Sequence, residues 1–160
     1  MTHLIATFFY VGHLRPGPGT WGSLAALPVA WALYILGGPW AMVAGVILSY
    51  VLGVWATGME TKGKDDHDPS EIVIDEVAGQ WIALLPVAFG AQMNGASITD
   101  LWPGWIAAFV LFRLFDITKW GPVGWADNLH GPTGVMLDDV IAGLFAALGV
   151  ILLAGLAHMV

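Results

Sequence analysis

The stretch Ile74-Asp75-Glu76-Val77-Ala78-Gly79-Gln80-Trp81 decides the fold of this chain, because it puts two adjacent acids inside an apolar segment that runs from Ile72 to Gly90. A second acidic pair, Asp138-Asp139, opens another apolar segment at 135–157. Removing carboxylates from water costs several kcal/mol per group unless a partner compensates. The two pairs therefore indicate a bound cation.

The composition is that of a membrane protein. Of the 160 residues, 58% are hydrophobic and only 11% are charged, with a mean hydropathy of +0.76. In a soluble domain roughly a quarter of the residues are charged. No Ser-rich or Pro-rich linker separates two compositions, so we expect residues 1–160 to form a single domain.

The charge and the cysteine count exclude several classes of function. A net charge of -7 argues against a nucleic-acid partner and against adsorption to anionic lipid through a basic patch. The chain has no cysteine, which excludes disulfides, thiolate metal sites and a cysteine nucleophile. An anionic substrate would need help to approach so many acids.

We expect an all-α fold, in the form of a polytopic membrane bundle with about five membrane-embedded helices. Several of the apolar segments are shorter than the roughly 20 residues that a full span prefers. A tight turn at Gly37-Gly38-Pro39 separates the first two. The five segments are Ser23 to Leu36, Trp40 to Ala56, Ile72 to Gly90, Leu101 to Ile117 and Met136 to Ala157.

The basic residues predict how these helices are oriented. The connections 37–39 and 91–100 contain no Lys or Arg. Alternation of the connections across the bilayer therefore puts every loop cation on one side, which the positive-inside rule identifies as cytoplasmic. Both acidic pairs fall at the same end, which predicts a polar site at the cytoplasmic end of a multi-pass protein. The loop cations are Arg15, Lys62, Lys64 and Lys119.

The first acidic pair is followed by small residues on the same broad face of the expected helix, namely Ala78, Gly79 and Ala83. Small residues mark close helix packing, so Asp75 and Glu76 are expected to point into the bundle. The alternative interpretation is an interfacial helix start, where acids are favoured by the positive end of the helix dipole.

The second pair repeats this design, since the pattern Asp-x-x-Ala-Gly can be read from Asp75 and again from Asp139. This repeat is too short to indicate a duplication, but it predicts two similar helix ends packed against each other. Oxygen ligands from several such ends suit Mg²⁺, which usually takes one or two carboxylates and keeps its waters for a phosphate. Asp75, Glu76, Asp138 and Asp139 are thus candidate metal ligands and catalytic acids.

A third motif, Phe112-Arg113-Leu114-Phe115-Asp116-Ile117-Thr118-Lys119, puts Arg113 and Asp116 on one helix face, with Lys119 a further three residues along. In the functional interpretation Asp116 binds metal, while Arg113 and Lys119 contact phosphate oxygens. The alternative is a structural ion pair that holds the helix end.

Two polar loops complete the candidate site. The Gly/Pro turn at 15–23 runs into a helix start, with Thr20 or Ser23 as the N-cap, and such a start can offer backbone N–H groups to a phosphate. It lacks the Gly-Lys-Ser/Thr ending of a nucleotide P-loop, so it predicts no NTPase. The loop at 127–134 contains His130, which is either a general acid or an ordinary loop histidine.

Together these motifs resemble the phosphatidylglycerophosphatase A family over roughly residues 10 to 145. The resemblance rests on the order of the motifs and on their spacing. The motifs are Pro18 to Leu24, His67-Asp68, Ile72 to Trp81, Phe112 to Lys119, and His130-Gly131 ahead of Gly134 to Gly143.

The resemblance implies a Mg²⁺-dependent membrane lipid phosphatase that converts phosphatidylglycerol phosphate into phosphatidylglycerol and phosphate in bacterial phospholipid synthesis. It would lie in the cytoplasmic (inner) membrane, with membrane lipids around it. The sequence carries no indication of an oligomeric state. Residues that match the acidic and basic positions of the family are Asp75, Glu76, Asp116, Asp138 and Asp139, and Arg113 and Lys119.

Two departures from the family pattern lie in loops. The family often has Lys-Pro-x-Pro where this chain reads Lys119-Trp120-Gly121-Pro122, and Pro132 replaces the second Gly of a His-Gly-Gly loop. Both departures affect loop geometry. The acidic set is intact.

Two mechanisms and one rival function follow from these residues. Either metal-activated water attacks the phosphate, with Arg113 and Lys119 stabilising charge, or Asp75 or Asp138 attacks directly and forms an aspartyl phosphate. The rival function is a cation channel or transporter, because intramembrane carboxylates also mark ion pathways. A transporter would spread its acids through the depth of the bilayer, whereas these cluster at one end.

Overall fold

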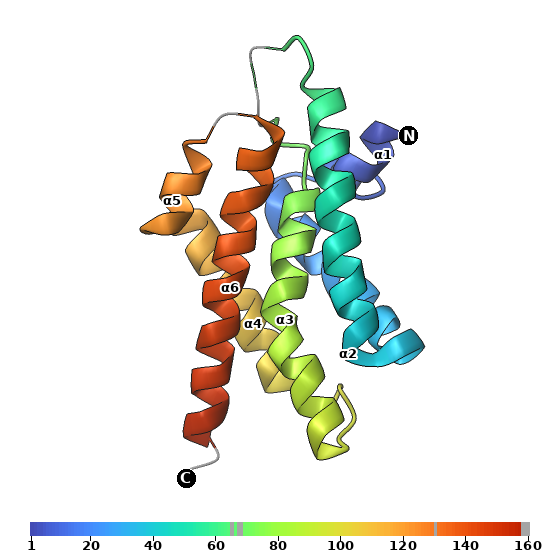
Figure 1. Ribbon diagram of the computed structural model, residues 1–160, viewed down its shortest axis with the longest axis vertical. Coiled ribbons are helices and arrows are strands. Elements are labelled where there is room, and N and C mark those ends of the chain that lie inside the picture. The colour runs from blue at the N-terminus through green and yellow to red at the C-terminus, as the bar shows by residue number, and fades with distance from the viewer. Residues whose placement is uncertain (65, 67–68, 130, 158–160) are drawn as a thin grey trace.

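The computed structural model describes residues 1–64, 66, 69–129 and 131–157, which form a bundle of helices (Figure 1). These residues contain no β-strand, so the expected all-α class is confirmed. The helices are α1 (Thr2–Ala6), the 3-10 helix η1 (Val11–His13), α2 (Pro18–Glu60), α3 (Ile74–Asn94), α4 (Trp102–Thr118), α5 (Pro122–Asp127) and α6 (Pro132–Ala157).

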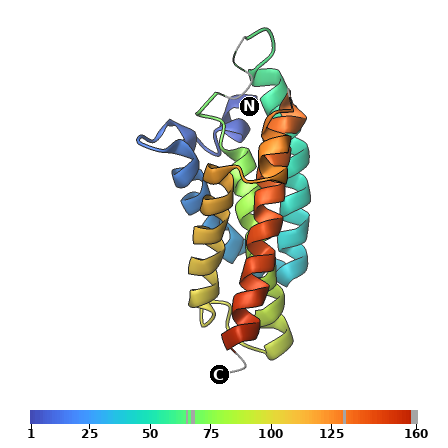
Figure 2. The same ribbon diagram turned by 90° about the vertical axis from the view of Figure 1, so that its left-hand side faces the viewer.

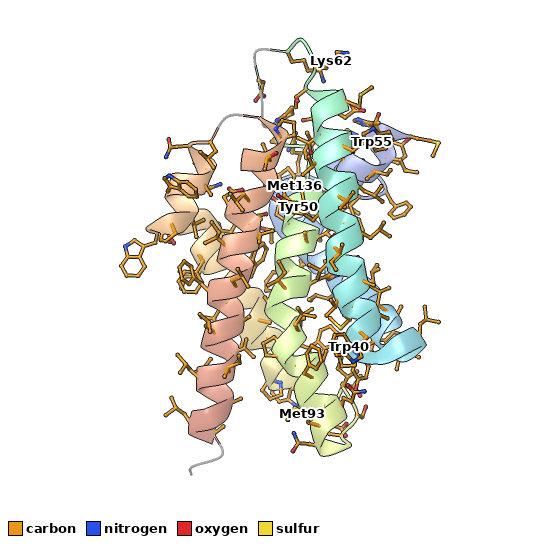
Figure 3. All side chains as sticks on the ribbon, in the orientation of Figure 1. Trp40, Tyr50, Trp55, Lys62, Met93 and Met136 are labelled. Carbon is orange, nitrogen blue, oxygen red and sulfur yellow. The ribbon has the colours of Figure 1, made fainter. Side chains whose placement is uncertain are left out.

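Helix α2 consists of two parts that fold back on each other at the predicted glycine turn. Gly37 and Gly38 have non-helical backbone angles, and Gly38 has a φ of 64°, which favours a residue without a Cβ. The second part then runs from the lower end of the bundle, where Trp40 is labelled in Figure 3, to the upper end at Trp55. The turn between the first two apolar segments is therefore confirmed.

Helix α3 lies at the centre of the bundle, and most of its residues are buried. It packs chiefly against α2 and α6. The indole Nε1 of Trp81 donates a hydrogen bond of 2.9 Å to the carbonyl of Ala26 in the first part of α2. The acids of α3 are thus held by the best-packed helix of the fold.

Helices α3 and α6 run in the same direction, and α4 runs the opposite way (Figures 1 and 2). The first part of α2 also runs parallel to α3. Three helix N-termini and the C-terminus of α4 therefore meet at the upper end of Figure 1. Helix N-termini carry partial positive charge, so each of these three starts favours an anion, whereas the C-terminal ends of α4 and α2 at the same end favour cations.

Two short α-helices, like the 3-10 helix η1, were not expected from the sequence. Helix α1 lies beside the end of α2, where Thr2 Oγ1 donates to Glu60 Oε1 at 2.6 Å. Helix α5 packs on α6 through the buried side chains of Val123 and Ala126. With five and six residues, both are too short to be stable alone and depend on these contacts.

Two helices, α2 and α6, are long and apolar enough to cross a membrane by length and composition. Helix α4, with 17 residues, is shorter than the roughly 20 residues that a full span prefers. Large apolar side chains nevertheless cover the outside of the bundle on α2, α4 and α6, and Leu152 on α6 is 69% exposed. A soluble monomer rarely exposes such a continuous apolar surface.

Candidate metal and phosphate site

Asp75 and Glu76 lie in the first turn of α3, because the helix begins at Ile74, two residues later than expected. The N–H of Val73 instead donates to the carbonyl of Ala6 at 2.9 Å, which ties this helix start to the N-terminal segment. Asp75 is buried and Glu76 is half-buried. Both interpretations of the pair therefore hold, since the acids face the bundle and also lie at the positive end of the helix dipole.

Asp138 and Asp139 are buried in the second turn of α6. The expectation that they open this helix is wrong, because α6 begins at Pro132. Proline suits the first turn of a helix, since its φ is already helical and its missing N–H has no partner to lose there. The extra turn places the acids below the helix end.

The two Asp-x-x-Ala-Gly patterns pack against each other through their glycines. A Cβ on Gly79 would lie 2.6 Å from the backbone oxygen of Asp139, and a Cβ on Gly143 would lie 2.4 Å from the backbone oxygen of Gly79. Real Cβ atoms essentially never lie this close to another atom, so the two helices can touch backbone to backbone only because both positions are glycine. The predicted packing of two similar helix ends is confirmed.

This packing brings carboxylates from two helices together. Ligand oxygens of Asp75, Glu76 and Asp139 all lie within 4.8 Å of one another. Asp116, which is buried near the end of α4, is close enough to interact electrostatically with Glu76 and Asp139. We call Asp75, Glu76 and Asp139 the acid cluster.

Arg113 lies beside the acid cluster. Its Nη1 forms an ion pair with Asp116 three residues along α4, and it lies 4.0 Å from Glu76 Oε1. Its Nε is buried and has no hydrogen-bond partner among the described residues. The guanidinium thus balances two acids and keeps one donor for a further acceptor.

The first part of α2 closes the site on the Arg113 side. Ser23 is buried, and its Oγ accepts a hydrogen bond of 3.5 Å from Arg113 Nη1. The prediction that Thr20 or Ser23 caps this helix is wrong, because the N-cap is Gly17 and the Ser23 hydroxyl donates to the Gly19 carbonyl inside the helix. Pro18 starts the helix two residues before Thr20.

Lys119 is held by two acids outside the acid cluster. Its Nζ donates to Asp127 Oδ1 at 2.6 Å and to Asp138 Oδ2 at 2.5 Å. Burial alone would lower the pKa of Lys119, but these two hydrogen bonds outweigh burial and raise it above the usual lysine value. Lys119 therefore stays charged, and Asp138 faces a cation while Asp139 faces the acid cluster.

Three residues near the site were not assigned a role from the sequence. A Cβ on Gly19 would collide with the carboxylate of Glu76 and come within 3.2 Å of Arg113 Nη1. Asp127 binds Lys119, and the Gln80 amide is fully buried without a hydrogen-bond partner among the described residues. In the sequence, these three residues were marked only by their position within or beside the motifs. His130 lies outside the described residues.

The donor set of the acid cluster fits a hard divalent cation. All its ligand atoms are carboxylate oxygens, which Mg²⁺ prefers. Glu76 Oε2 and Asp139 Oδ1 are buried and have no hydrogen-bond partner among the described residues. A bound cation would offset the repulsion among buried carboxylates this close together. A cation here would in turn attract an anionic group toward Arg113.

Comparison with known proteins identifies the family. The sequence model of phosphatidylglycerophosphatase A matches residues 4–154. The chain belongs to the phosphatidylglycerophosphatase A family. It is therefore a member of a family of phosphatases, as the resemblance of its motifs implied, and the match contains every acid of the site.

Curated relatives of this family cover most of the chain. Phosphatidylglycerophosphatase A of Escherichia coli is 38% identical over 91% of this chain and 78% of its own length, and that of Haemophilus influenzae is 36% identical over 91% and 84%. A Bacteroides thetaiotaomicron protein with the provisional name phosphatidylinositol-3-phosphatase is 39% identical over 89% and 87%. No solved structure shows a significant match to this chain.

Proposed function

We propose that this protein is a Mg²⁺-dependent lipid phosphatase that hydrolyses phosphatidylglycerol phosphate to phosphatidylglycerol and inorganic phosphate. Membership of the phosphatidylglycerophosphatase A family supports the substrate. The observation that carries the proposal is the convergence of the acid cluster, Asp75, Glu76 and Asp139, beside Arg113. A cation and a phosphate are the two ligands that this arrangement of charges suits.

In this proposal Asp75, Glu76 and Asp139 hold Mg²⁺, and Asp116 and Asp138 complete the acidic set around it. When bound, the ion supplies positive charge that polarises the phosphoryl group and offsets its repulsion by the acids. Arg113 stabilises charge on the phosphoryl oxygens through its fork of N–H donors. Lys119 does the same from the Asp138 side, where two acids keep its ammonium charged.

Further phosphate contacts come from the helix start of α2 and from the loop before α6. Ser23 lies next to Arg113, Thr20 lies one residue beyond Gly19, which borders the site, and we assign His130 the role of donating a proton to the departing alcohol. Water attacks phosphorus, the ester P–O bond breaks, and the products are phosphatidylglycerol and inorganic phosphate. In the alternative mechanism Asp75 or Asp138 attacks first and water then hydrolyses the aspartyl phosphate. Isolation of a phosphoenzyme would decide between them.

We further propose that the bundle spans the bacterial inner membrane with the acid cluster at the cytoplasmic face. The apolar exterior of α2, α4 and α6 supports a lipid environment. Lys62 lies at the acidic end of the bundle (Figure 3), and the N–H of Lys64 donates to the nearby Thr61 carbonyl at 3.0 Å, so both cations are where the positive-inside rule requires them at a cytoplasmic end. The chain has no native cysteine, so the variant Lys64→Cys should react only with reagents applied from the cytoplasm.

The channel or transporter alternative has no support in the positions of the acids. Among the described residues, the acids of the three helical motifs lie at the upper end of the bundle, in the first two turns of α3 and α6 and near the end of α4. An ion pathway would need polar groups that continue toward the other end. Below the site, α6 contains only apolar and glycine residues as far as Ala157.

The test is phosphate release by the purified chain from phosphatidylglycerol phosphate in mixed micelles. We expect release with Mg²⁺ and none after EDTA treatment, with recovery when Mg²⁺ is added back. Full activity in EDTA would disprove the metal proposal while leaving the phosphatase assignment intact. Absence of release with every divalent cation would disprove the substrate.

A further inference from the structure

The N-terminal segment, residues 1–15, exposes two aromatic side chains near the upper end of the bundle. Phe9 is 70% exposed and Tyr10 is 56% exposed. The preceding residue, Phe8, is buried instead, and its ring packs edge-on against Trp81 at a centroid distance of 6.4 Å. The core thus accounts for one aromatic residue at this place and leaves the next two without an inward contact of this kind. We call Phe9 and Tyr10 the aromatic tip.

The backbone of the aromatic tip is left-handed, which is costly for residues with a Cβ. Phe8, Phe9 and Tyr10 have φ values of 45°, 59° and 67°. Hydrogen bonds hold this conformation, since the N–H of Phe9 donates to the Leu4 carbonyl at 2.8 Å and that of Tyr10 to Thr7 Oγ1 at 3.1 Å. The tip is therefore a fixed turn that presents two rings outward, and a preorganised contact loses less entropy on binding.

The N-terminal segment lies level with the end of the second part of α2. Thr2 Oγ1 donates to Glu60 Oε1 at 2.6 Å, and Figure 1 shows α1 beside the upper part of α2. From Trp40 to Glu60 the helix rises about 30 Å, which is the thickness of the hydrocarbon core of a bilayer. A bilayer that begins at Trp40 would therefore end beside the N-terminal segment. Aromatic rings are favoured at that boundary.

Two properties favour lipid as the partner of the aromatic tip. The apolar exterior of α2 continues up to the level of α1, since Val51, Trp55 and Met59 follow at intervals of four and are 58%, 48% and 53% exposed (Figure 3). The chain has no Asp or Glu before Glu60, and Arg15 is exposed. The segment therefore continues an apolar surface and brings no carboxylate that would repel lipid phosphates.

We propose that Phe9 and Tyr10 insert into the headgroup layer of the bilayer around the bundle, so that the N-terminal segment is an interfacial anchor. This inference rests on the membrane location in the proposed function. It adds a lipid contact made by a part of the chain outside the long helices. The contact is made by aromatic rings, which suits a chain whose net charge of -7 disfavours adsorption through a basic patch.

The anchor is joined to the helix that contributes two acids to the acid cluster. The N–H of Val73 donates to the Ala6 carbonyl at 2.9 Å. A Cβ on Gly12 would collide with the backbone oxygen of Glu71, so the segment also packs closely on the chain that enters α3. The anchor thus holds the start of α3, and with it Asp75, at the depth of the lipid phosphates.

The test uses single cysteines, because the chain has no native one. Phe9→Cys, the control Leu148→Cys on the exposed side of α6 and the control Lys62→Cys in an exposed loop are each labelled with the fluorophore NBD. The labelled proteins are reconstituted in vesicles of phosphatidylethanolamine and phosphatidylglycerol. We expect nitroxides on the lipid headgroup to quench the Phe9 label most strongly, nitroxides in the middle of the acyl chain the Leu148 label, and iodide in the water the Lys62 label.

The two controls separate failure of the anchor from failure of the membrane location. If iodide quenches the Phe9 label as strongly as the Lys62 label while acyl-chain nitroxides quench the Leu148 label, the anchor is overturned and the membrane location stands. A Leu148 label that neither lipid nitroxide quenches would overturn the membrane location, and the anchor with it. The phosphatase activity is measured separately by phosphate release.

A second measurement uses the wild-type chain, so it does not depend on the folding of a variant. A phospholipid with a photoreactive group on its head should crosslink to Phe9 and Tyr10 in the same vesicles. The crosslinked residues are located by mass spectrometry. Absence of a crosslink at both residues would contradict the proposal.

Discussion

Helices α3 and α6 contain the same Asp-x-x-Ala-Gly pattern, yet they use their acids differently. When the patterns are aligned, Asp75 corresponds to Asp139, and both belong to the acid cluster. The additional acid follows the pattern's Asp in α3, as Glu76, but precedes it in α6, as Asp138. Neighbouring residues of a helix point about 100° apart, so the two extra acids leave the shared pair in different directions.

This difference places each extra acid near a different cation. Glu76 lies 4.0 Å from Arg113 Nη1, and Asp138 accepts a hydrogen bond of 2.5 Å from Lys119. The aligned acids are fixed by backbone contact at Gly79 and Gly143, and the unaligned acids by partners on other segments. The repeated pattern thus sets the position of the acid cluster, and the residues outside the pattern set its charge balance.

Substitution of the α6 acids should separate these two roles most clearly. We expect Asp139→Asn to lower kcat at least about a thousandfold, because it removes an anionic ligand that no neighbour replaces. We expect Asp138→Asn to lower kcat only about 10- to 100-fold, since its carboxylate acts through Lys119. Initial rates of phosphate release over a Mg²⁺ titration measure both. Equal losses in the two variants would show that Asp138 is also a direct ligand.

The glycine contact between the two helices should be sensitive to a single methyl group. Gly143→Ala places a Cβ against the Gly79 backbone, so we expect a loss of about 1–3 kcal/mol of unfolding free energy together with lower activity. Gly155→Ala in the same helix meets open space and should cause no loss. Thermal unfolding in detergent compares the two. Equal stability of both variants would mean that the helices can separate without cost.

The smallest expected effect concerns the pH dependence of the Lys119 pairs. Because the pKa of Lys119 is raised in the folded state, its contribution to stability is complete below the unfolded-state value of about 10.4 and is lost only as the pH rises through the folded value. The difference in Tm between the wild type and Lys119→Met should thus be the same at pH 8 and pH 10. A difference that shrinks by pH 10 would contradict the raised pKa. The exposed Lys64→Met variant is the control.

Much of the fold was predictable because its helices are long and apolar. The turn at Gly37 and Gly38 and the positions of the long helices follow from hydropathy and from glycine chemistry. The start of α3 was misplaced because Val73 gives its N–H to Ala6, a contact with a distant part of the chain. Helix α5 was missed because its stability comes from packing on α6, which its six residues do not reveal.

The candidate site was predictable where it depends on helical spacing. The convergence of Asp75 and Asp139 follows from the repeated pattern. The two acids that bind Lys119 could not be predicted in this way. Helix α4 ends at Thr118, and Lys119 adopts a left-handed conformation with a φ of 50°. Its side chain therefore leaves the face of Arg113 and Asp116 and reaches Asp127 and Asp138. A change of backbone direction at one residue is not encoded in the helical period.

The contact between Gly79 and Gly143 also has a consequence for engineering. Because two backbones hold the aligned acids in place, the site does not depend on the leucines that cover the outside of α6, such as Leu148 and Leu152. Those side chains face outward, toward the surroundings of the bundle. Replacing the outer surface with polar residues, while the glycines are kept, is a direct route to a water-soluble form of this catalyst.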